Sequence, residues 1–333
     1  MPIIDTEVVN GVTTNILYGD TLGSLVKHQQ AGSQTLSAFV GTIAVGDART
    51  IKDHATGGND TLQGSGFVAT LYGDARSMTG HGRGGDDVFH STARSAKVVG
   101  DAERMDHHAT GGNDTIGGGA LGSSSSLYGD AVTMSGHARG GNDSITFTGG
   151  NFIQAYGDAE TLSGHSRGGN DSITVSNGGN PASLTAILYG DGSLSGKARG
   201  GDDTVAGSGN AASNTLYGDG SLSDKAHGGD DILISGAGVP DLMWGDGEIV
   251  GPDATTGSDR FVFTPGNGAD VIGDFERGKD DIDLTAFATA GIHGLDDLVF
   301  TQAETETVID LGDGNSVTLL GVTALCEKDF LFT

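Results

Sequence analysis

The chain has 333 residues, of which 60 are glycine, 5 are proline and 6% are aromatic, so a large conventional hydrophobic core is not expected. Lysine and arginine number 17 against 44 aspartate and glutamate residues, giving a formal net charge of −27. Such a surface repels phosphate backbones and anionic lipids, which disfavours nucleic acid and membranes as partners and suits multivalent cations.

The N-terminal segment, residues 1–11, has neither a basic region nor an apolar stretch of signal-peptide length. No apolar run reaches the roughly 18 residues that a membrane helix needs. The single cysteine, Cys326, excludes an internal disulfide framework. We therefore expect no membrane insertion, and either a cytosolic protein or one exported by a route that does not read the N-terminus.

One unit recurs along most of the chain, as in "LYGDAVTMSGHARGGNDSITF" at 127–147, where Tyr-Gly-Asp is followed by Gly-Gly-Asn-Asp. The aspartates of both motifs recur every 27 to 29 residues, with one longer step near residue 180. A fixed period of this kind is typical of a solenoid. After Asp20, the Gly-Asp column contains Asp47, Asp74, Asp101, Asp130, Asp158, Asp191, Asp219 and Asp246. The second column, called here the turn column, contains Asp60, Asp87, Asp114, Asp143, Asp171, Asp203, Asp231 and a degenerate member, Asp259.

Short strands are expected on either side of these columns. An apolar residue lies two positions after each turn-column aspartate, often beyond a Thr or Ser, which is the alternation of a strand with one buried face. Further apolar columns precede and follow each Gly-Asp. These patterns predict an all-β fold, a parallel β-roll or β-solenoid with coils of about 28 residues and two or three strands per coil. The insertion at 176–183 is expected to bulge from a turn, and the first coil is degenerate because Gln34 replaces the turn-column aspartate.

The aspartate columns predict calcium binding. Stacked coils would place equivalent carboxylates about 4.8 Å apart, where neighbouring charges repel by roughly 3–4 kcal/mol at an effective dielectric constant near 20. A divalent cation between coils turns this repulsion into a net attraction. Carboxylate, amide and glycine carbonyl oxygens suit multiple Ca²⁺ ions. Turn formation alone would explain one such aspartate, but not eight in register. The candidate ligands are both columns together with Asn59, Asn113, Asn142 and Asn170.

These residues resemble the RTX, or haemolysin-type, calcium-binding repeat family, whose nonapeptide is G-G-x-G-x-D-x-U-x. The match lies in "GGNDTL" at 57–62, "GGNDTI" at 111–116 and "GGNDSI" at 140–145 and 168–173. The resemblance implies a β-roll that folds only with Ca²⁺, with the turn-column aspartates up to Asp231 as side-chain ligands. The sequence departs from the family where the leading glycines become Ala138-Arg139, and in its coil, which is longer than two nonapeptides.

The resemblance continues into the C-terminal region. Residues 257–287 are similar to the segment that closes RTX rolls, and "EKDFLFT" at the C-terminus resembles a signal read by type I secretion machinery. We expect two regions: calcium-binding repeats over 1–260, and a capping and secretion-signal region over 261–333 with strands at "DDIDL" and "SVTLLGV". The resemblance thus implies a secreted, extracellular protein, with association with the cell surface as an open alternative.

No passenger enzyme is identified, since no His is followed by Glu and a His-Glu-x-x-His motif is therefore absent. A column of six histidines from His28 to His165 continues as Lys197 and Lys225, which favours a solvated cationic position over a transition-metal site. We expect a non-enzymatic structural or surface protein that self-assembles through an exposed solenoid end. A soluble module that binds a surface polysaccharide is the alternative, and an enzyme on the solenoid surface is the third possibility.

Overall fold

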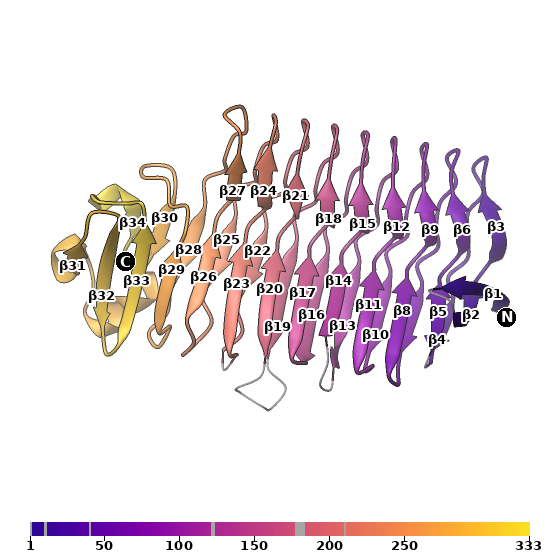
Figure 1. The fold of residues 1–333 in the computed structure, drawn as a ribbon, viewed down its shortest axis with the longest axis horizontal. Helices are drawn as coiled ribbons and strands as arrows, with labels where there is room; N and C mark the ends of the chain where they lie inside the picture. Colours follow the sequence, from indigo (N-terminus) through magenta and orange to yellow (C-terminus); the bar gives the residue numbers. More distant parts are fainter. Residues whose placement is uncertain (1, 10–11, 40, 121–123, 177–183, 210) are drawn as a thin grey trace.

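The computed structural model describes residues 2–9, 12–39, 41–120, 124–176, 184–209 and 211–333. The chain forms a parallel β-solenoid in which each coil contributes one strand to each of three sheets (Figure 1). The all-β prediction is confirmed, and three strands per coil resolves the question of two or three. Most of the insertion predicted at 176–183 lies outside the described residues.

Two sheets form the body of the solenoid. The 14-stranded sheet consists of β1 (Ile3–Val9), β2 (Val12–Tyr18), β5 (Thr42–Val45), β8 (Val68–Tyr72), β11 (Ser95–Val99), β14 (Ser124–Tyr128), β17 (Phe152–Tyr156), β20 (Thr185–Tyr189), β23 (Ser213–Tyr217), β26 (Asp241–Trp244), β29 (Ala269–Ile272), β33 (Asn315–Leu320), β32 (Glu306–Gly312) and β31 (Val299–Gln302). The 11-stranded sheet consists of β4 (Thr35–Ala38), β7 (Thr61–Gly64), β10 (Val88–Ser91), β13 (Thr115–Ala120), β16 (Ser144–Gly149), β19 (Ser172–Ser176), β22 (Thr204–Ala206), β25 (Ile232–Ile234), β28 (Arg260–Val262), β30 (Asp281–Asp283) and β34 (Phe330–Leu331).

The third sheet forms an arm beside the body. Its nine strands are β3 (Thr21–Leu25), β6 (Ala48–Ile51), β9 (Ala75–Met78), β12 (Ala102–Met105), β15 (Ala131–Met134), β18 (Ala159–Leu162), β21 (Ser193–Leu194), β24 (Gly220–Ser223) and β27 (Gly247–Val250). After each arm strand the chain turns and comes back through a return segment, which pairs with its neighbours by one bridge per coil, such as Arg139 to Arg167. The tips of these turns form the upper row in Figure 1.

Each coil therefore encloses two apolar cores. In the body, inward residues of both sheets, such as Ile145 and Leu127, are fully buried. In the arm, Met134 packs with Ala138 of the return segment. The chain crosses between body and arm twice per coil, and the two aspartate columns lie at these crossings. We call this region the waist.

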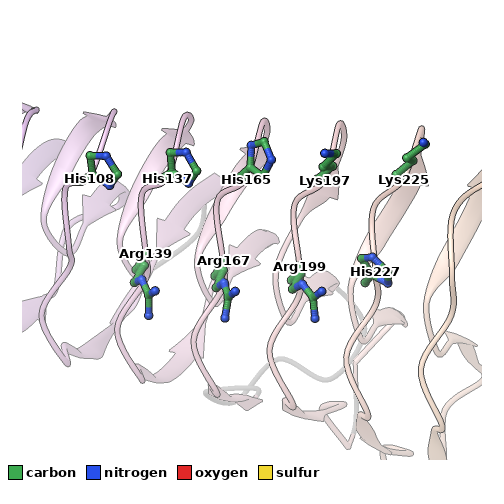
Figure 2. A pocket seen from close by; sticks show the side chains of 9 residues that line it. All are labelled: His108, His137, Arg139, His165, Arg167, Lys197, Arg199, Lys225 and His227. Atoms are coloured by element: carbon green, nitrogen blue, oxygen red, sulfur yellow. The ribbon is translucent and has the colours of Figure 1, made fainter.

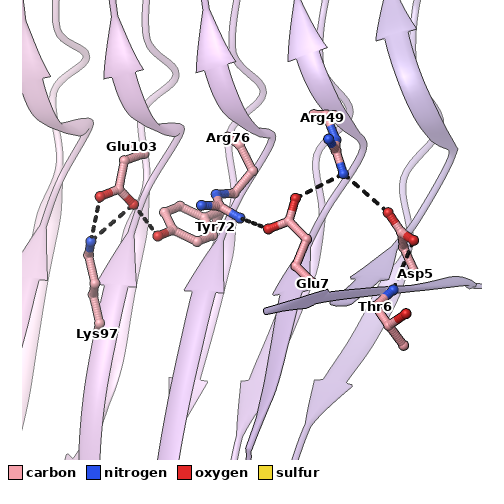
Figure 3. Close-up of polar contacts among 8 residues, drawn as sticks. All are labelled: Asp5, Thr6, Glu7, Arg49, Tyr72, Arg76, Lys97 and Glu103. Carbon is pink, nitrogen blue, oxygen red and sulfur yellow. Dashed lines mark hydrogen bonds and ion pairs between the residues drawn. The ribbon is translucent and has the colours of Figure 1, made fainter. Parts of the chain in front are cut away.

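The N-terminal strand closes part of the first coil. β1 pairs antiparallel with β2, so the first coil is less open than the degenerate sequence suggested. Figure 3 shows β1 joined to two coils by ion pairs: Arg49 contacts Asp5 and Glu7 at 3.1 and 2.9 Å, and Arg76 contacts Glu7 at 3.3 Å. β3 and β4 remain the edge strands of their sheets at this end.

At the other end, β28, β29 and β30 continue the parallel sheets, and the antiparallel strands β31, β32 and β33 follow. Both expected C-terminal strands are present, as β30 and β33. Three short 3-10 helices lie in this region: η1 (Thr285–Ala290), η2 (Leu295–Asp297) and η3 (Glu327–Asp329). The predicted division at residue 260 falls inside β28 and stays a prediction.

Candidate metal centre

The Gly-Asp column lies where the 14-stranded sheet leads into the arm. From Asp47 to Asp246 its members are between 0 and 4% exposed. Each carboxylate accepts a hydrogen bond from the return segment of its own coil. For Asp130 the donor is the backbone N–H of Gly141, at 2.8 Å, and for Asp47 it is that of Gly58, also at 2.8 Å. This column therefore ties the two crossings of one coil together at the waist.

The turn column lies at the second crossing, and it connects different coils. The Oδ1 atom of Asp143 accepts from the backbone N–H of Asp114, and Oδ1 of Asp171 accepts from that of Asp143, both at 2.6 Å. The same bond recurs along the column at 2.6 to 3.0 Å. It accounts for one oxygen of each buried carboxylate.

The second oxygen of these carboxylates has no hydrogen-bond partner. Among the described residues, buried and unpartnered atoms include Oδ2 of Asp60, Asp87, Asp101, Asp114, Asp130, Asp143, Asp171, Asp203, Asp231 and Asp259, and Oδ1 of Asp47 and Asp191. An unsatisfied buried carboxylate oxygen is costly, and one at nearly every coil indicates a missing partner rather than a local defect.

These free oxygens converge with backbone carbonyls. A Cβ atom placed on Gly100 would lie 2.1 Å from Asp114 Oδ2 and 1.5 Å from the carbonyl oxygen of Gly129. A Cβ on Gly111 would lie 1.8 Å from Asp130 Oδ1 and 2.4 Å from Asp101 Oδ2, so carboxylates of successive coils also face one another. Glycine is required at both positions because any side chain would occupy the space in which these oxygens meet.

Burial raises the pKa values of all eight turn-column aspartates and of several Gly-Asp aspartates, Asp47 among them. Loss of contact with water is the largest cause, and repulsion from neighbouring carboxylates adds to it in most members. The pKa rises to about 7 for Asp47, about 8 for Asp60 and about 9 for Asp259. For Asp114 and Asp171 it rises well above the ordinary value, for the same two reasons. The columns therefore oppose ionisation unless positive charge is supplied.

This donor set fits a hard cation such as Ca²⁺. It consists only of oxygen atoms, from carboxylates and glycine carbonyls, which are the ligands that Ca²⁺ prefers. As they stand, the described residues contain no group of three or more His, Cys, Asp or Glu side chains placed to hold a metal ion. The fit therefore depends on both columns together with backbone carbonyls, and the ligand assignment stays a prediction.

The predicted asparagine ligands lie apart from the waist. Asn59, Asn113, Asn142 and Asn170 are exposed. The side-chain oxygens of Asn113 and Asn142 each accept a backbone N–H from the following coil, at 2.8 Å. The structure thus does not bring these side chains to the unpartnered carboxylate oxygens.

Two further aspartates extend the columns beyond the predicted set. Asp274 accepts hydrogen bonds from the backbone N–H groups of Gly245, Asp246 and Gly247, and Asp280 accepts from that of Asp259 at 3.0 Å. Asp274 could have been found, because Gly273-Asp274 follows Asp246 by 28 residues. Asp280 comes only 21 residues after Asp259, which breaks the period.

At the N-terminal end an amide takes the place of a carboxylate. The Nε2 atom of Gln34 donates to Asp20 Oδ1 at 2.7 Å, and the backbone N–H of Gln34 donates to Asp60 Oδ1 at 2.6 Å. Gln34 thus occupies the turn-column position that the sequence assigned to it, and it begins the column without adding a charge.

One segment, "GHSRG" at 164–168, has the Gly-x-Ser-x-Gly spacing of a hydrolase nucleophile. Ser166 is fully buried in the arm, at the position that Ala138 occupies in the preceding coil, and its hydroxyl has no partner. Its hydroxyl is therefore not accessible to a substrate in this conformation.

Comparison with known proteins gives no identification: no family model matches the chain, and no curated protein matches it significantly. The resemblance to RTX repeats therefore rests on the motifs, and a β-solenoid of about nine coils with aspartate-rich turns is compatible with it. Within the described ranges, no helix combines the length and apolar character needed to cross a membrane.

Proposed function

We propose that this chain is a secreted structural β-roll that is stabilised by Ca²⁺ and assembles outside the cell. One observation carries the calcium part: the row of buried carboxylate oxygens that lack any hydrogen-bond partner, repeated in register through the waist. Many buried Asp residues of this kind are typical of metal binding, and the role proposed is a non-enzymatic one.

The chain's own residues define how ions would be held. Asp114 and Asp143 of the turn column, with Asp101 and Asp130 of the Gly-Asp column, supply carboxylate oxygens, and Gly129 supplies a carbonyl. Bound Ca²⁺ supplies the positive charge that cancels repulsion between coils. The hydrogen bonds to Oδ1 keep each turn-column carboxylate oriented, so that its Oδ2 faces the waist.

Secretion is proposed on the basis of the same chemistry and of the resemblance of the C-terminal region to a type I export signal. Extracellular calcium modules bind Ca²⁺ with dissociation constants of roughly 10⁻⁴–10⁻³ M, far above the free concentration inside a cell. Before export the ionised columns would repel one another and keep the chain unfolded. Once outside, millimolar Ca²⁺ would complete the fold.

Assembly is proposed to occur through the N-terminal end of the solenoid. β3 and β4 present unpaired strand edges there, and unpaired edges favour pairing with another chain. The outer strand β1 also exposes apolar side chains, since Ile4 and Val8 are 65 and 72% exposed. A second copy of the chain is the partner that these features suit.

Circular dichroism during a Ca²⁺ titration of chelator-treated protein tests the calcium part. We expect the strand signal to develop cooperatively with Ca²⁺ and weakly with Mg²⁺, which demands tighter octahedral geometry. A complete strand spectrum in excess chelator at neutral pH would reject calcium-dependent folding. Electron microscopy of the same samples tests assembly, since single rods at millimolar Ca²⁺ and high concentration would contradict it.

A further inference from the structure

A groove lined only by cationic and imidazole side chains runs along the outer face of the arm (Figure 2). It has a volume of about 510 Å³ and nine lining residues, of which five are lysine or arginine. The chain as a whole has 17 lysine and arginine residues and a net charge of −27. The groove has no carboxylate in its lining, so its charge is opposite in sign to the net charge of the chain.

The groove consists of rungs of two basic side chains, one rung per coil. In the coil of Ala138, the inward alanine separates His137 from Arg139, so alternation along the return segment directs both flanking side chains outward. The next two rungs are His165 with Arg167 and Lys197 with Arg199. Parallel bridges join the three arginines, and the His137 and His165 rings stack with centroids 4.8 Å apart. Figure 2 shows the two resulting parallel rows.

The groove arginines have no acidic partner. Arg139, Arg167 and Arg199 are exposed, and none of them forms an ion pair within the described residues. Arg49 and Arg76, by contrast, are neutralised by Asp5 and Glu7. Stacking three unpaired guanidinium groups along one line is electrostatically unfavourable, and a bound polyanion would relieve that repulsion.

We propose that this groove binds a linear acidic polysaccharide, with the carboxylate or sulfate groups of successive sugars placed on successive rungs. Arginine suits this role because its planar group contacts such anions through two parallel hydrogen bonds. The lysines Lys197 and Lys225 add charge without demanding one geometry. The groove lining contains none of the predicted calcium ligands, so the polysaccharide would bind without contacting calcium.

A nucleic acid fits the groove less well. Phosphates along one strand of a duplex repeat every 3.4 Å or so, whereas coils repeat at about 4.8 Å, so register is lost within a few rungs. Single-strand binding grooves add Phe, Tyr or Trp rings on which bases stack, and the groove lining contains none of these.

The test measures binding of the full chain to dextran sulfate and to polygalacturonate, with neutral dextran as the uncharged control. We expect both anionic polymers to bind, neutral dextran not to bind, and affinity to fall steeply with salt. Substituting Arg139→Gln, Arg167→Gln and Arg199→Gln together should weaken binding roughly 10- to 100-fold and lower the salt slope by about 3. The matched control changes three exposed cations outside the groove, Lys27→Gln, Arg94→Gln and Lys328→Gln, and should leave affinity nearly unchanged.

Circular dichroism of each variant separates this question from calcium-dependent folding, because a folded variant that fails to bind reports on the groove alone. Equal losses in the groove and control variants would overturn the proposal, since they would indicate attraction to net charge. Tighter binding of single-stranded oligothymidylate than of either polysaccharide would also overturn it. The proposal would also be overturned if the wild type bound no polysaccharide and the groove variant lost self-association. In that case the groove would bind the acidic face of a second copy.

Discussion

The backbone N–H of Asp143 donates a 2.6 Å hydrogen bond to the carboxylate of Asp171 in the next coil. This contact uses one oxygen of Asp171 and orients the other, which has no partner. The same aspartate column therefore combines a structural hydrogen bond between coils with a free charge-bearing atom in the waist. The two roles can be separated by substitution.

Asp143→Asn keeps an oxygen that can accept from the N–H of Asp114 but removes the charge, whereas Asp143→Ala removes both. We expect the alanine variant to lose about 1–3 kcal/mol of unfolding free energy in saturating Ca²⁺. The asparagine variant should show more strand signal than wild type in chelator, because one repelling charge is removed, and it should require several-fold more Ca²⁺ to reach the full strand signal. If both variants behave alike in chelator and in Ca²⁺, the carboxylate acts only in the turn.

The metal-free fold should lose stability as pH rises. The pKa values of Asp47, Asp60 and Asp259 are raised by burial to about 7, 8 and 9, whereas an unfolded carboxyl ionises near pH 4. A raised folded-state pKa contributes stability that is complete below about pH 4 and disappears as pH passes through 7 to 9. The strand signal in circular dichroism of chelator-treated protein should thus disappear as the pH rises from 5 to 9, and saturating Ca²⁺ should preserve it across this range. A metal-free protein that is most stable at pH 9 would contradict the assignment.

Central and terminal members of the turn column should differ in their effect. Asp143 lies between coils that both carry turn-column aspartates, whereas Asp60 is bonded to Gln34, where the column begins. Because solenoid stability is a sum over neighbouring coils, Asp143→Ala should raise the Ca²⁺ midpoint more than Asp60→Ala. Equal shifts measured by Ca²⁺ titration would indicate that ions are not shared between coils.

Gly100→Ala should be strongly destabilising, because the new methyl group would overlap Asp114 Oδ2 and the carbonyl oxygen of Gly129. A loss of about 1–3 kcal/mol or more in denaturant unfolding is expected, together with weaker Ca²⁺ binding. Gly294→Ala is the matched control, since a Cβ there has no neighbour within 4 Å. Comparable losses in the two variants would indicate that the oxygens beside Gly100 do not restrict this position to glycine.

Charge placed on β1 should prevent assembly without affecting the fold. Ile4→Lys combined with Val8→Lys changes two exposed side chains of the outer strand, so the Ca²⁺ midpoint should remain at its wild-type value. Light scattering at millimolar Ca²⁺ should then report a monomer in place of larger assemblies. Thr301→Lys with Gln302→Lys, in exposed positions on β31 at the other end, provides the comparison. If only this second pair blocks assembly, the contact lies at the C-terminal end.

The repeat made most of the fold predictable, because the period of about 28 residues and the alternating apolar positions specify stacked parallel strands. Both aspartate columns are buried, as expected for residues facing an internal site. The division of each coil into body and arm was not foreseen, since the return segment pairs through single residues such as Arg139 and has no strand pattern. Asp280 was missed because its coil is shorter, and the antiparallel pairing of β1 has no counterpart in the repeat.

The hydrogen bonds of the turn column give the rod a polarity. Every aspartate amide in the column relies on the coil that follows it, and the last one, that of Asp259, relies on Asp280. Removing coils from the N-terminus therefore leaves each remaining aspartate amide of the column with its carboxylate acceptor. Removing coils from the C-terminus leaves the buried N–H group of the last remaining column aspartate without its acceptor. Shortened versions of this protein should therefore keep all their remaining turn-column bonds when trimmed at the N-terminus and lose one of them when trimmed at the C-terminus.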